Sequence, residues 1–427
     1  MNRSGRDQTG GEPGRARPRV AYLLPDPGIP VGGTKGASVH VDALCGALSR
    51  WGADVTLYAA KVVGPLSAPG SDGVTVVPVD VGPVRSGAGA DVSRMAAADR
   101  FFSVVERAAG ADRPDWLHER LSLFAGEGTA MAARLGLPRV VEVNAPVADE
   151  RAAHFSLTLR DEAAAAEHEA LAGASVVAVS APLAAWAARL GAARTRVVPN
   201  GAFLDPLGSR GRAWARRVQR HRLGFGDEVV VGFTGSLKPW HGVELLVDAV
   251  GRASARARVG LLVVGDGPAR HAVGRAMSNL PRRVTRVMTG AVPSRMVPEY
   301  LAAMDLAAAP YLPAGTFYFS PLKVAEAMAT HLPVVASDFP PVRELLGDAG
   351  VVVPPGDPDA LAGAIAELAA DRDRRLRLAH DGWQRAAARL DWQEVARQVA
   401  DAVPWPVAGA GARRAVAAPT HSSALGA

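Results

Sequence analysis

The chain has 427 residues, a formal net charge of +6 at pH 7 and a single cysteine, Cys45. This length exceeds one compact core and predicts two domains of about 150–200 residues each. A lone cysteine excludes internal disulfides and fits a reducing, cytoplasmic compartment. The basic balance suits a phosphorylated ligand or an acidic membrane surface, and we find no nucleic-acid motif that would favour a nucleic-acid partner.

Both ends of the chain are predicted to lie outside the folded domains. Residues 1–18 are rich in arginine, glycine and proline and lack the apolar core of a secretory signal. Residues 405–427 are rich in alanine and glycine, and we expect them to be disordered. No apolar run between the two tails reaches the roughly 20 residues that span a bilayer. We therefore predict a cytoplasmic protein whose basic surface permits peripheral contact with the inner membrane face.

In the first half of the chain, short apolar strands alternate with helical segments. We expect strands over 19–24, 54–59, 116–120, 140–146 and 175–180, and helices over 37–51, 92–109, 126–135 and 149–172. A glycine-rich loop that contains Gly33 joins the first strand to the first helix, and its glycines permit close approach of the backbone to a ligand. The loop has neither the Gly-x-Gly-x-x-Gly spacing of a dinucleotide site nor the Walker pattern.

The second half repeats this alternation. We expect strands over 228–235, 259–264, 284–288, 306–309, 334–336 and 351–353, and helices over 243–253, 294–303, 358–370, 372–389 and 391–403, with one more starting near 321. Alternation of this kind predicts a doubly wound parallel sheet in each half, an α/β fold. We place the first domain at 19–205, a polar hinge at 206–227 and the second domain at 228–390. A last helix at 391–404 could return to the first domain.

The stretch that begins at Ser320 carries the clearest chemistry. Ser320 is a good N-cap, and Pro321 suits the first helical position. A helix that begins in this way presents unpaired N–H groups and the positive end of its dipole, which suit a phosphate. Lys323 adds a positive charge, and Glu326, three residues on, could accept hydrogen bonds from the hydroxyls of a sugar. An ordinary capped helix with a surface Lys–Glu pair is the alternative interpretation.

Polar residues also follow two neighbouring strands of the first domain. Glu119-Arg120 ends one strand, and Glu142-Val-Asn144 lies at the end of the next. Ligands of parallel α/β sheets gather at the carboxyl ends of strands, so these residues mark a reaction cleft. The alternative interpretation is that these are ordinary charged residues where strands lead into loops, without a functional role.

Together these pieces resemble the GT-B glycosyltransferases, specifically the large retaining family 4. The resemblance runs from about residue 19 to 400 and implies two Rossmann-like domains that face a central cleft. Each motif is weak by itself, but their order and spacing are specific. The motifs that carry it are Gly32-Gly33 with Lys35–His40, Glu142–Pro146, Val198–Gly201, Gly235–Gly242, Val264–Pro268 and Ser320–Ala329.

The resemblance implies that the second domain holds a nucleotide sugar and the first domain supplies the acceptor side. Glu326 would then bond the ribose hydroxyls, and Lys323, with the N–H groups of Leu322 and Lys323, would meet the diphosphate. The loop that starts at Gly235 would also approach the phosphates through Ser236 and Lys238. The backbone near Met288 and Thr289 would hold the base. No cofactor and no metal ion is expected, because the nucleotide sugar is itself a substrate and because cations and helix dipoles would neutralise its diphosphate.

The chain departs from the family pattern at several positions. Tyr318 stands where the family has the first of two carboxylates eight positions apart, so one hydrogen-bonding carboxylate is missing. The basic residues of the first phosphate loop fall on Ser236 and His241. A histidine pattern at two strand ends becomes Arg120, which could balance diphosphate charge from across the cleft, and Asn144, which could hydrogen-bond the donor sugar.

The resulting prediction is a retaining, metal-independent glycosyltransferase. It would move a sugar from a nucleoside diphosphate to the hydroxyl of a natural product, a glycolipid or a polysaccharide precursor. Its predicted catalytic residues are Arg120, Glu142, Asn144, Lys238 and Lys323. A nucleotide-sugar epimerase or phosphorylase of the same fold, and a non-catalytic scaffold, are the alternatives. The donor base, the sugar, the acceptor and the oligomeric state are left open by the sequence.

Overall fold

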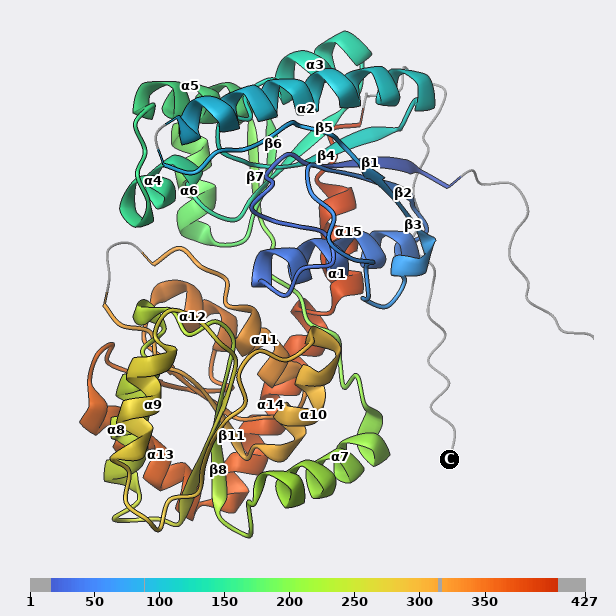
Figure 1. The fold of residues 1–427 in the computed structure, drawn as a ribbon. Helices are drawn as coiled ribbons and strands as arrows, with labels where there is room; N and C mark the ends of the chain where they lie inside the picture. Colours follow the sequence, from blue (N-terminus) through green and yellow to red (C-terminus); the bar gives the residue numbers. More distant parts are fainter. Residues whose placement is uncertain (1–16, 88, 314–316, 406–427) are drawn as a thin grey trace, which may run out of the picture.

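The computed structural model describes residues 17–87, 89–313 and 317–405, which form two α/β domains one above the other (Figure 1). The predicted tails lie almost entirely outside this range. Each domain contains one fully parallel sheet, of seven strands in the first domain and six in the second. The predicted GT-B-like pair of doubly wound sheets is thus confirmed. Within the described residues, no helix is both long enough and apolar enough to cross a membrane.

The first sheet has the strand order β3-β2-β1-β4-β5-β6-β7. Alternate residues of β1 point to opposite faces, as the pleat requires. Tyr22 and Leu24 pack toward α1, whereas Ala21 and Leu23 pack toward α2 and α3. The elements of this domain are β1 (Arg19–Leu24), α1 (Gly36–Trp51), β2 (Asp54–Ala59), β3 (Val74–Pro78), α2 (Ala90–Asp112), β4 (Trp116–Arg120), α3 (Gly128–Leu135), β5 (Arg139–Val143), α4 (Val147–His154), α5 (Arg160–Leu171), β6 (Ser175–Ala178), α6 (Ala181–Arg189) and β7 (Arg194–Val197).

The second sheet has the order β10-β9-β8-β11-β12-β13, so its order reverses between β8 and β11. The carboxyl ends of the strands beside such a switch point form the usual ligand crevice of an open α/β sheet. The elements here are α7 (Gly208–Leu223), β8 (Val229–Thr234), α8 (Val243–Ala253), β9 (Val259–Val264), α9 (Arg270–Ser278), β10 (Arg286–Met288), α10 (Val297–Ala303), β11 (Leu306–Ala309), α11 (Leu322–Ala329), β12 (Val334–Ser337), α12 (Pro340–Leu346), β13 (Val351–Val353), α13 (Pro358–Ala370) and α14 (Arg372–Arg389).

Several elements differ from the prediction. The long helix predicted over 149–172 is two helices, α4 and α5, because the carboxylate of Asp91 accepts hydrogen bonds from the backbone of Thr158 and Leu159 between them. Helices α9 and α12 were not predicted. Helix α9 buries only Val273 and Met277, so its apolar stripe is weak, and α12 begins with two prolines.

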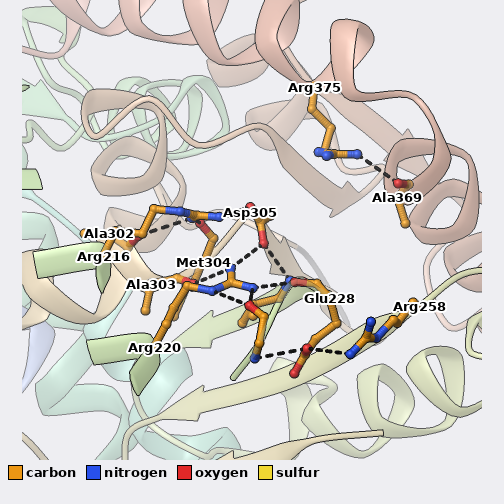
Figure 2. A network of polar contacts seen from close by, with 12 residues as sticks. Arg216, Arg220, Glu228, Arg258, Ala302, Ala303, Met304, Asp305, Ala369 and Arg375 are labelled. Atoms are coloured by element: carbon orange, nitrogen blue, oxygen red, sulfur yellow. Dashed lines mark hydrogen bonds and ion pairs between the residues drawn. The ribbon is translucent and has the colours of Figure 1, made fainter. Parts of the chain in front are cut away.

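Residues 206–227, predicted as a hinge, are mostly helix α7, which packs against α10 of the second domain. Arg216 and Arg220 of α7 donate to the two carboxylate oxygens of Asp305 at 2.6 and 2.8 Å (Figure 2). Arg220 also donates to the carbonyls of Gly226 and Glu228. Charge-assisted bonds of this kind fix α7 to the second domain, so the chain passes between domains before residue 208.

A second connection joins the domains near the C-terminal end of the described chain. Helix α15 (Trp392–Asp401) packs along α1 of the first domain, and Trp392 is buried in that domain's core. Figure 1 shows α15 crossing from the lower domain to the upper one. Ala202 pairs with Asp391 in an isolated parallel bridge, so the two connecting segments run side by side.

Candidate active site

Helix α11 begins at the switch point of the second sheet, but its start is built differently from the prediction. Pro321 takes the N-cap place, and no side chain caps the helix. The hydroxyl of Ser320 instead accepts a hydrogen bond from the backbone N–H of Asn200, at 2.9 Å. The N–H groups of Leu322 and Lys323 have no acceptor within the described residues. Two free donors and the positive end of the helix dipole therefore point out of α11.

The loop after β8 lies directly against α11. Gly235 has a φ of +122°, and a Cβ at this position would lie 3.3 Å from Cε of Lys323. A glycine is required here because other residues rarely adopt this φ and would crowd the lysine. The next loop supports this one, since the N–H of Leu237 donates to the carbonyl of Asp266 at 2.9 Å. The structure thus brings Gly235 and Lys323 together, as predicted.

The ammonium group of Lys323 is half-buried among aromatic rings. Its Nζ lies 4.2 Å from the ring centre of Phe233 at the end of β8 and 5.1 Å from that of Tyr311, just after β11. Burial lowers the pKa of Lys323 to about 7; the charge of Glu326 opposes this shift, and the positive charge of Lys238 adds to it. Lys323 is therefore a cation whose charge the surrounding protein only partly compensates.

The carboxyl group of Glu326 lies one turn along α11. Burial raises the pKa of Glu326 to about 7, although the charge of Lys323 opposes the shift. Both side chains are half-buried, and no ion pair within 4 Å joins them in the described structure. The simpler interpretation of a surface Lys–Glu pair is therefore wrong. Glu326 keeps its acceptor oxygens available for a ligand.

Lys238 and His241 are the two basic residues of the Gly235 loop. Nζ of Lys238 lies 4.8 Å from the ring centre of Trp240. Nδ1 of His241 lies 2.6 Å from the carbonyl oxygen of Ser236, so this nitrogen carries the proton and donates it. Burial and then the neighbouring Lys323 charge lower the pKa of His241 to about 3. His241 is neutral at pH 7 and orders the loop, whereas the lysines supply its charge.

The predicted base-binding turn lies at the end of the edge strand β10. Met288 is the last residue of β10, and the N–H of Thr289 donates to the carbonyl of Val263 at 3.0 Å. The Thr289 hydroxyl donates to the carbonyl of Gly290. The N–H of Thr289 is therefore engaged within the protein and is not available to a base.

In the first domain, near the ends of β4 and β5, four polar side chains surround the single carboxylate of Glu142. Glu142 is 1% exposed, and its oxygens lie 2.7 Å from Nε2 of His40, 3.0 Å from Nε2 of His118, 2.8 Å from a guanidinium nitrogen of Arg120 and 2.8 Å from the hydroxyl of Tyr22. Burial alone would raise the pKa of Glu142, but the charges of His40 and Arg120 and the hydrogen bonds hold it well below its ordinary value.

This enclosure corrects the prediction that Glu142 acts at the cleft. A carboxylate with four partners and almost no exposed surface has no acceptor oxygen left for a substrate. We therefore assign Glu142 the role of holding the side chain of Arg120, which is itself 6% exposed. Asn144 differs from both: it is half-buried, and its Oδ1 is buried without a hydrogen-bond partner.

The strand register explains why these side chains meet at Glu142. The sequence alone did not predict that His118 and His40 contact this carboxylate. Tyr22 pairs with His118, and Arg120 pairs with Glu142, across adjacent parallel strands. Because side chains alternate along a strand, His118 and Arg120 share one face of β4. The two-residue spacing of His118 and Arg120 could have signalled this, but the contact with His40 of α1 depends on the tertiary fold.

The glycine-rich loop of the first domain approaches the start of α11. A Cβ on Gly36 would lie 3.6 Å from Cδ1 of Leu322, and Leu322 packs against the core of the first domain. At Gly33 a Cβ would lie 2.8 Å from Oγ of Ser38, so this glycine is required by local packing. A crevice also lies between the domains, although Lys323 and Glu326 do not line it. It is lined by Val179, Ser180, Val197, Pro199, Ser320, Pro341, Glu344, Leu345, Arg385, Arg389 and Leu390.

Two Asp-x-Asp triplets occur in the chain, each at the start of a helix of the second domain. Asp357 accepts from the N–H groups of Asp359 and Ala360, and Asp371 accepts from that of Arg374. These first aspartates are N-caps of α13 and α14. In the described ranges there is no group of three or more histidine, cysteine, aspartate or glutamate residues that could hold a metal ion.

Comparisons with known proteins agree with this geometry. Residues 34–205 match the family described as Glycosyltransferase Family 4, and residues 228–371 match Glycosyl transferases group 1. The solved structure of HepE from Anabaena in complex with UDP superposes with a TM-score of 0.67 at 20% identity, over 90% of this chain and 98% of that one. Sucrose-phosphate synthase from Thermosynechococcus elongatus gives a TM-score of 0.69 at 22% identity, over 90% and 98%. These likenesses show the fold.

The two facing sheets and these matches define the chain as a GT-B glycosyltransferase. More narrowly, it belongs to glycosyltransferase family 4. It is similar to a D-inositol 3-phosphate glycosyltransferase from Xylanimonas cellulosilytica, with 30% identity over 91% of this chain and 97% of that protein. It is also similar to a GDP-mannose-dependent phosphatidylinositol monomannoside mannosyltransferase from Mycolicibacterium smegmatis, with 31% identity over 44% of this chain and 50% of that protein. The resemblance seen in the sequence is confirmed.

Proposed function

We propose that this glycosyltransferase uses a nucleoside-diphosphate sugar and transfers the sugar to an acceptor hydroxyl with retention of anomeric configuration, without a metal ion or other cofactor. The observation that carries the proposal is the meeting of the free N–H groups of α11, the partly compensated ammonium of Lys323 and the Gly235 loop at one switch point. A diphosphate would compensate this positive charge.

Glycosyl transfer from such a donor needs stabilisation of the departing diphosphate. The α11 amide dipoles, Lys323 and Lys238 are fixed donors on the second-domain side, and fixed donors need no reorganisation when charge develops. We assign Arg120 to the first-domain side and Asn144 to the donor sugar. We assign no protein group as general base, because Glu142 is enclosed and the leaving phosphate oxygen can itself take the acceptor proton.

The similar proteins narrow the ligands worth testing. HepE has been crystallised with UDP and with UDP-glucose, whereas the mycobacterial relative is named as dependent on GDP-mannose. Two of the relatives are named for acceptors that contain inositol, one as free inositol 3-phosphate and one as a lipid. We therefore propose a UDP- or GDP-sugar donor and a phosphorylated or lipid-linked polyol acceptor, reached in the cytoplasm or at its membrane face.

The test is incubation of the purified protein with UDP- and GDP-sugars, alone and with inositol phosphates or phosphatidylinositol vesicles, with and without EDTA. We expect slow release of free sugar from one donor and faster transfer when an acceptor is present, with the donor's anomeric configuration in the product by NMR. EDTA should leave the rate unchanged. Isomerised nucleotide sugar would show an epimerase, and tight binding without turnover would show a scaffold.

A further inference from the structure

Three residues just before α11 are fastened to the opposite domain. We call Tyr318–Ser320 the strap. The hydroxyl of Ser180, which follows β6, donates to the carbonyl of Tyr318 at 2.6 Å. Asn200, on the connection between the domains, donates from its backbone to Oγ of Ser320 at 2.9 Å and from Nδ2 to the carbonyl of Ser320 at 2.6 Å.

The side chain of Tyr318 adds to these backbone bonds. It is half-buried against the apolar cluster formed by β5, β6 and α6 of the first domain. Its hydroxyl lies close enough to the carboxylate of Glu150 on α4 for that negative charge to act on it. Burial, and then the negative charge of Glu150, raise the pKa of Tyr318 well above its ordinary value. The strap thus belongs to the second domain by sequence and contacts the first domain through both backbone and side chain.

These bonds hold the residues that precede α11 and leave the amide donors of its first turn free. The helix has only eight residues and no side-chain cap of its own, and a helix this short has little intrinsic stability. Ser180 and Ser320 are 4% and 8% exposed. Groups that are so well buried cannot exchange their hydrogen bonds for water without separation of the domains, so loss of one leaves its partner unsatisfied. The first turn of α11 is therefore held from the first domain.

The other half of the diphosphate site is fixed within the second domain. The N–H of Gly235 donates to the carbonyl of Val264 at 2.9 Å, so that loop is anchored to β9. The Gly235 loop therefore keeps its shape whatever the first domain does. The Leu322 and Lys323 amides, by contrast, follow the strap.

We propose that the strap is a positioning device through which the first domain sets the start of α11, and with it the amide donors that would meet the diphosphate. This inference rests on the proposed function, because it states how that same site is assembled.

Two serines of the first domain provide a matched test. Ser180→Ala removes the hydrogen bond to the strap, whereas Ser175→Ala removes a bond of the same type, from Oγ of Ser175 to the carbonyl of Ala402 at 2.7 Å, away from α11. We expect Ser180→Ala to weaken the binding of UDP or GDP, whichever the wild type binds, by about fivefold in calorimetry. Ser175→Ala should leave that affinity unchanged. Equal affinities, or equal losses, in the two variants would overturn the proposal.

Asn200→Asp is a second variant of nearly unchanged shape. It replaces the Nδ2 donor with a carboxylate oxygen that faces the carbonyl of Ser320. We expect a loss of about tenfold in nucleotide affinity, because two acceptors then oppose each other. A variant that folds and keeps wild-type affinity would contradict the proposal.

Hydrogen–deuterium exchange of α11 gives a readout that needs no ligand. We expect faster exchange of the α11 amides in Ser180→Ala than in Ser175→Ala, with unchanged exchange in β8 and β9. If the wild type binds neither UDP nor GDP, the proposed function fails, and this exchange difference still tests the strap. Unchanged α11 exchange in Ser180→Ala would show that the strap does not hold the helix.

Discussion

Two glutamates, one in each domain, lie near the ligand-facing ends of their sheets and have opposite environments. Glu142 has four hydrogen-bonding or ionic partners and is sealed in the first domain. Glu326 is half-buried and has no ion-pair partner in the described chain. The pKa of Glu142 is held low, whereas that of Glu326 is raised to about 7. Both residues are glutamates, so residue type does not distinguish a structural carboxylate from one that is available to a ligand. The difference is whether the carboxylate oxygens are already occupied by protein partners.

The largest effect should come from the sealed carboxylate. Glu142→Gln removes the charge that His40, His118 and Arg120 surround, and breaking a buried ionic cluster costs about 3–5 kcal/mol of unfolding free energy. We expect urea denaturation to show this loss at pH 7. Ser175→Ala, which removes one hydrogen bond at the start of the neighbouring strand β6 and leaves the cluster intact, is the control. Wild-type stability in Glu142→Gln would show that the cluster contributes little to folding.

The same carboxylate should govern stability in acid. The folded pKa of Glu142 lies well below the value of 4.5 for a free glutamate, so its contribution is present above pH 4.5 and is lost as the pH falls through the folded pKa. We expect the unfolding free energy of the wild type to fall below pH 4.5 more steeply than that of Glu142→Gln. Parallel pH profiles for the two proteins would contradict this assignment.

The available carboxylate should behave in the opposite way. Glu326→Ala is expected to lower kcat/KM for transfer by about 100-fold, because it removes hydrogen bonds to the donor from a charged acceptor. Its unfolding free energy should change little. Glu326→Gln should be at least as stable as the wild type at pH 8, since a raised folded pKa makes the ionised carboxylate a cost there. Near-normal transfer by Glu326→Ala would refute its assigned role.

Lys323 should give a smaller, pH-dependent effect. Lys323→Met is expected to weaken UDP or GDP binding by about tenfold at pH 7. The free ammonium has a pKa of about 7, and a bound diphosphate would raise it, so binding takes up a proton above pH 7 and weakens as pH rises. Lys323→Arg should remove this dependence because arginine stays charged. Calorimetry in buffers of different ionisation enthalpy measures the proton; no uptake near pH 8 would exclude this account.

The smallest effect should come from Lys238, at the outer side of the loop. Its Nζ lies over Trp240, and contacts of this type contribute about 0.5–1 kcal/mol. We expect Lys238→Ala to weaken nucleotide binding about threefold without a change in thermal midpoint. A loss as large as that of Lys323→Met would mean that Lys238, not Lys323, is the main cation of the site.

Residue patterns along the chain were sufficient to predict the alternation of strands and helices and the limits of β1, β2, β4, β9 and β11. Strands of parallel sheets are buried on both faces and read as apolar runs, so local composition locates them. The same patterns predicted where Lys323, Glu326 and the Gly235 loop lie, because local geometry places each of them. Lys323 lies at a helix start, Glu326 lies one turn further along, and Gly235 adopts a positive φ.

The remaining features depend on contacts between residues that are far apart in the sequence. Asp91 bonds the segment between α4 and α5, 67 residues further along the chain. Arg220 of α7 bonds Asp305, 85 residues away, and the N–H of Asn200 donates to the hydroxyl oxygen of Ser320, 120 residues away. The sequence predicted Glu142 as a cleft residue, but in the structure partners from α1, β1 and β4 enclose its carboxylate. A polar side chain forms a hydrogen bond with whichever suitable group the fold places within about 3 Å. The residues next to it in the sequence therefore do not predict its partner.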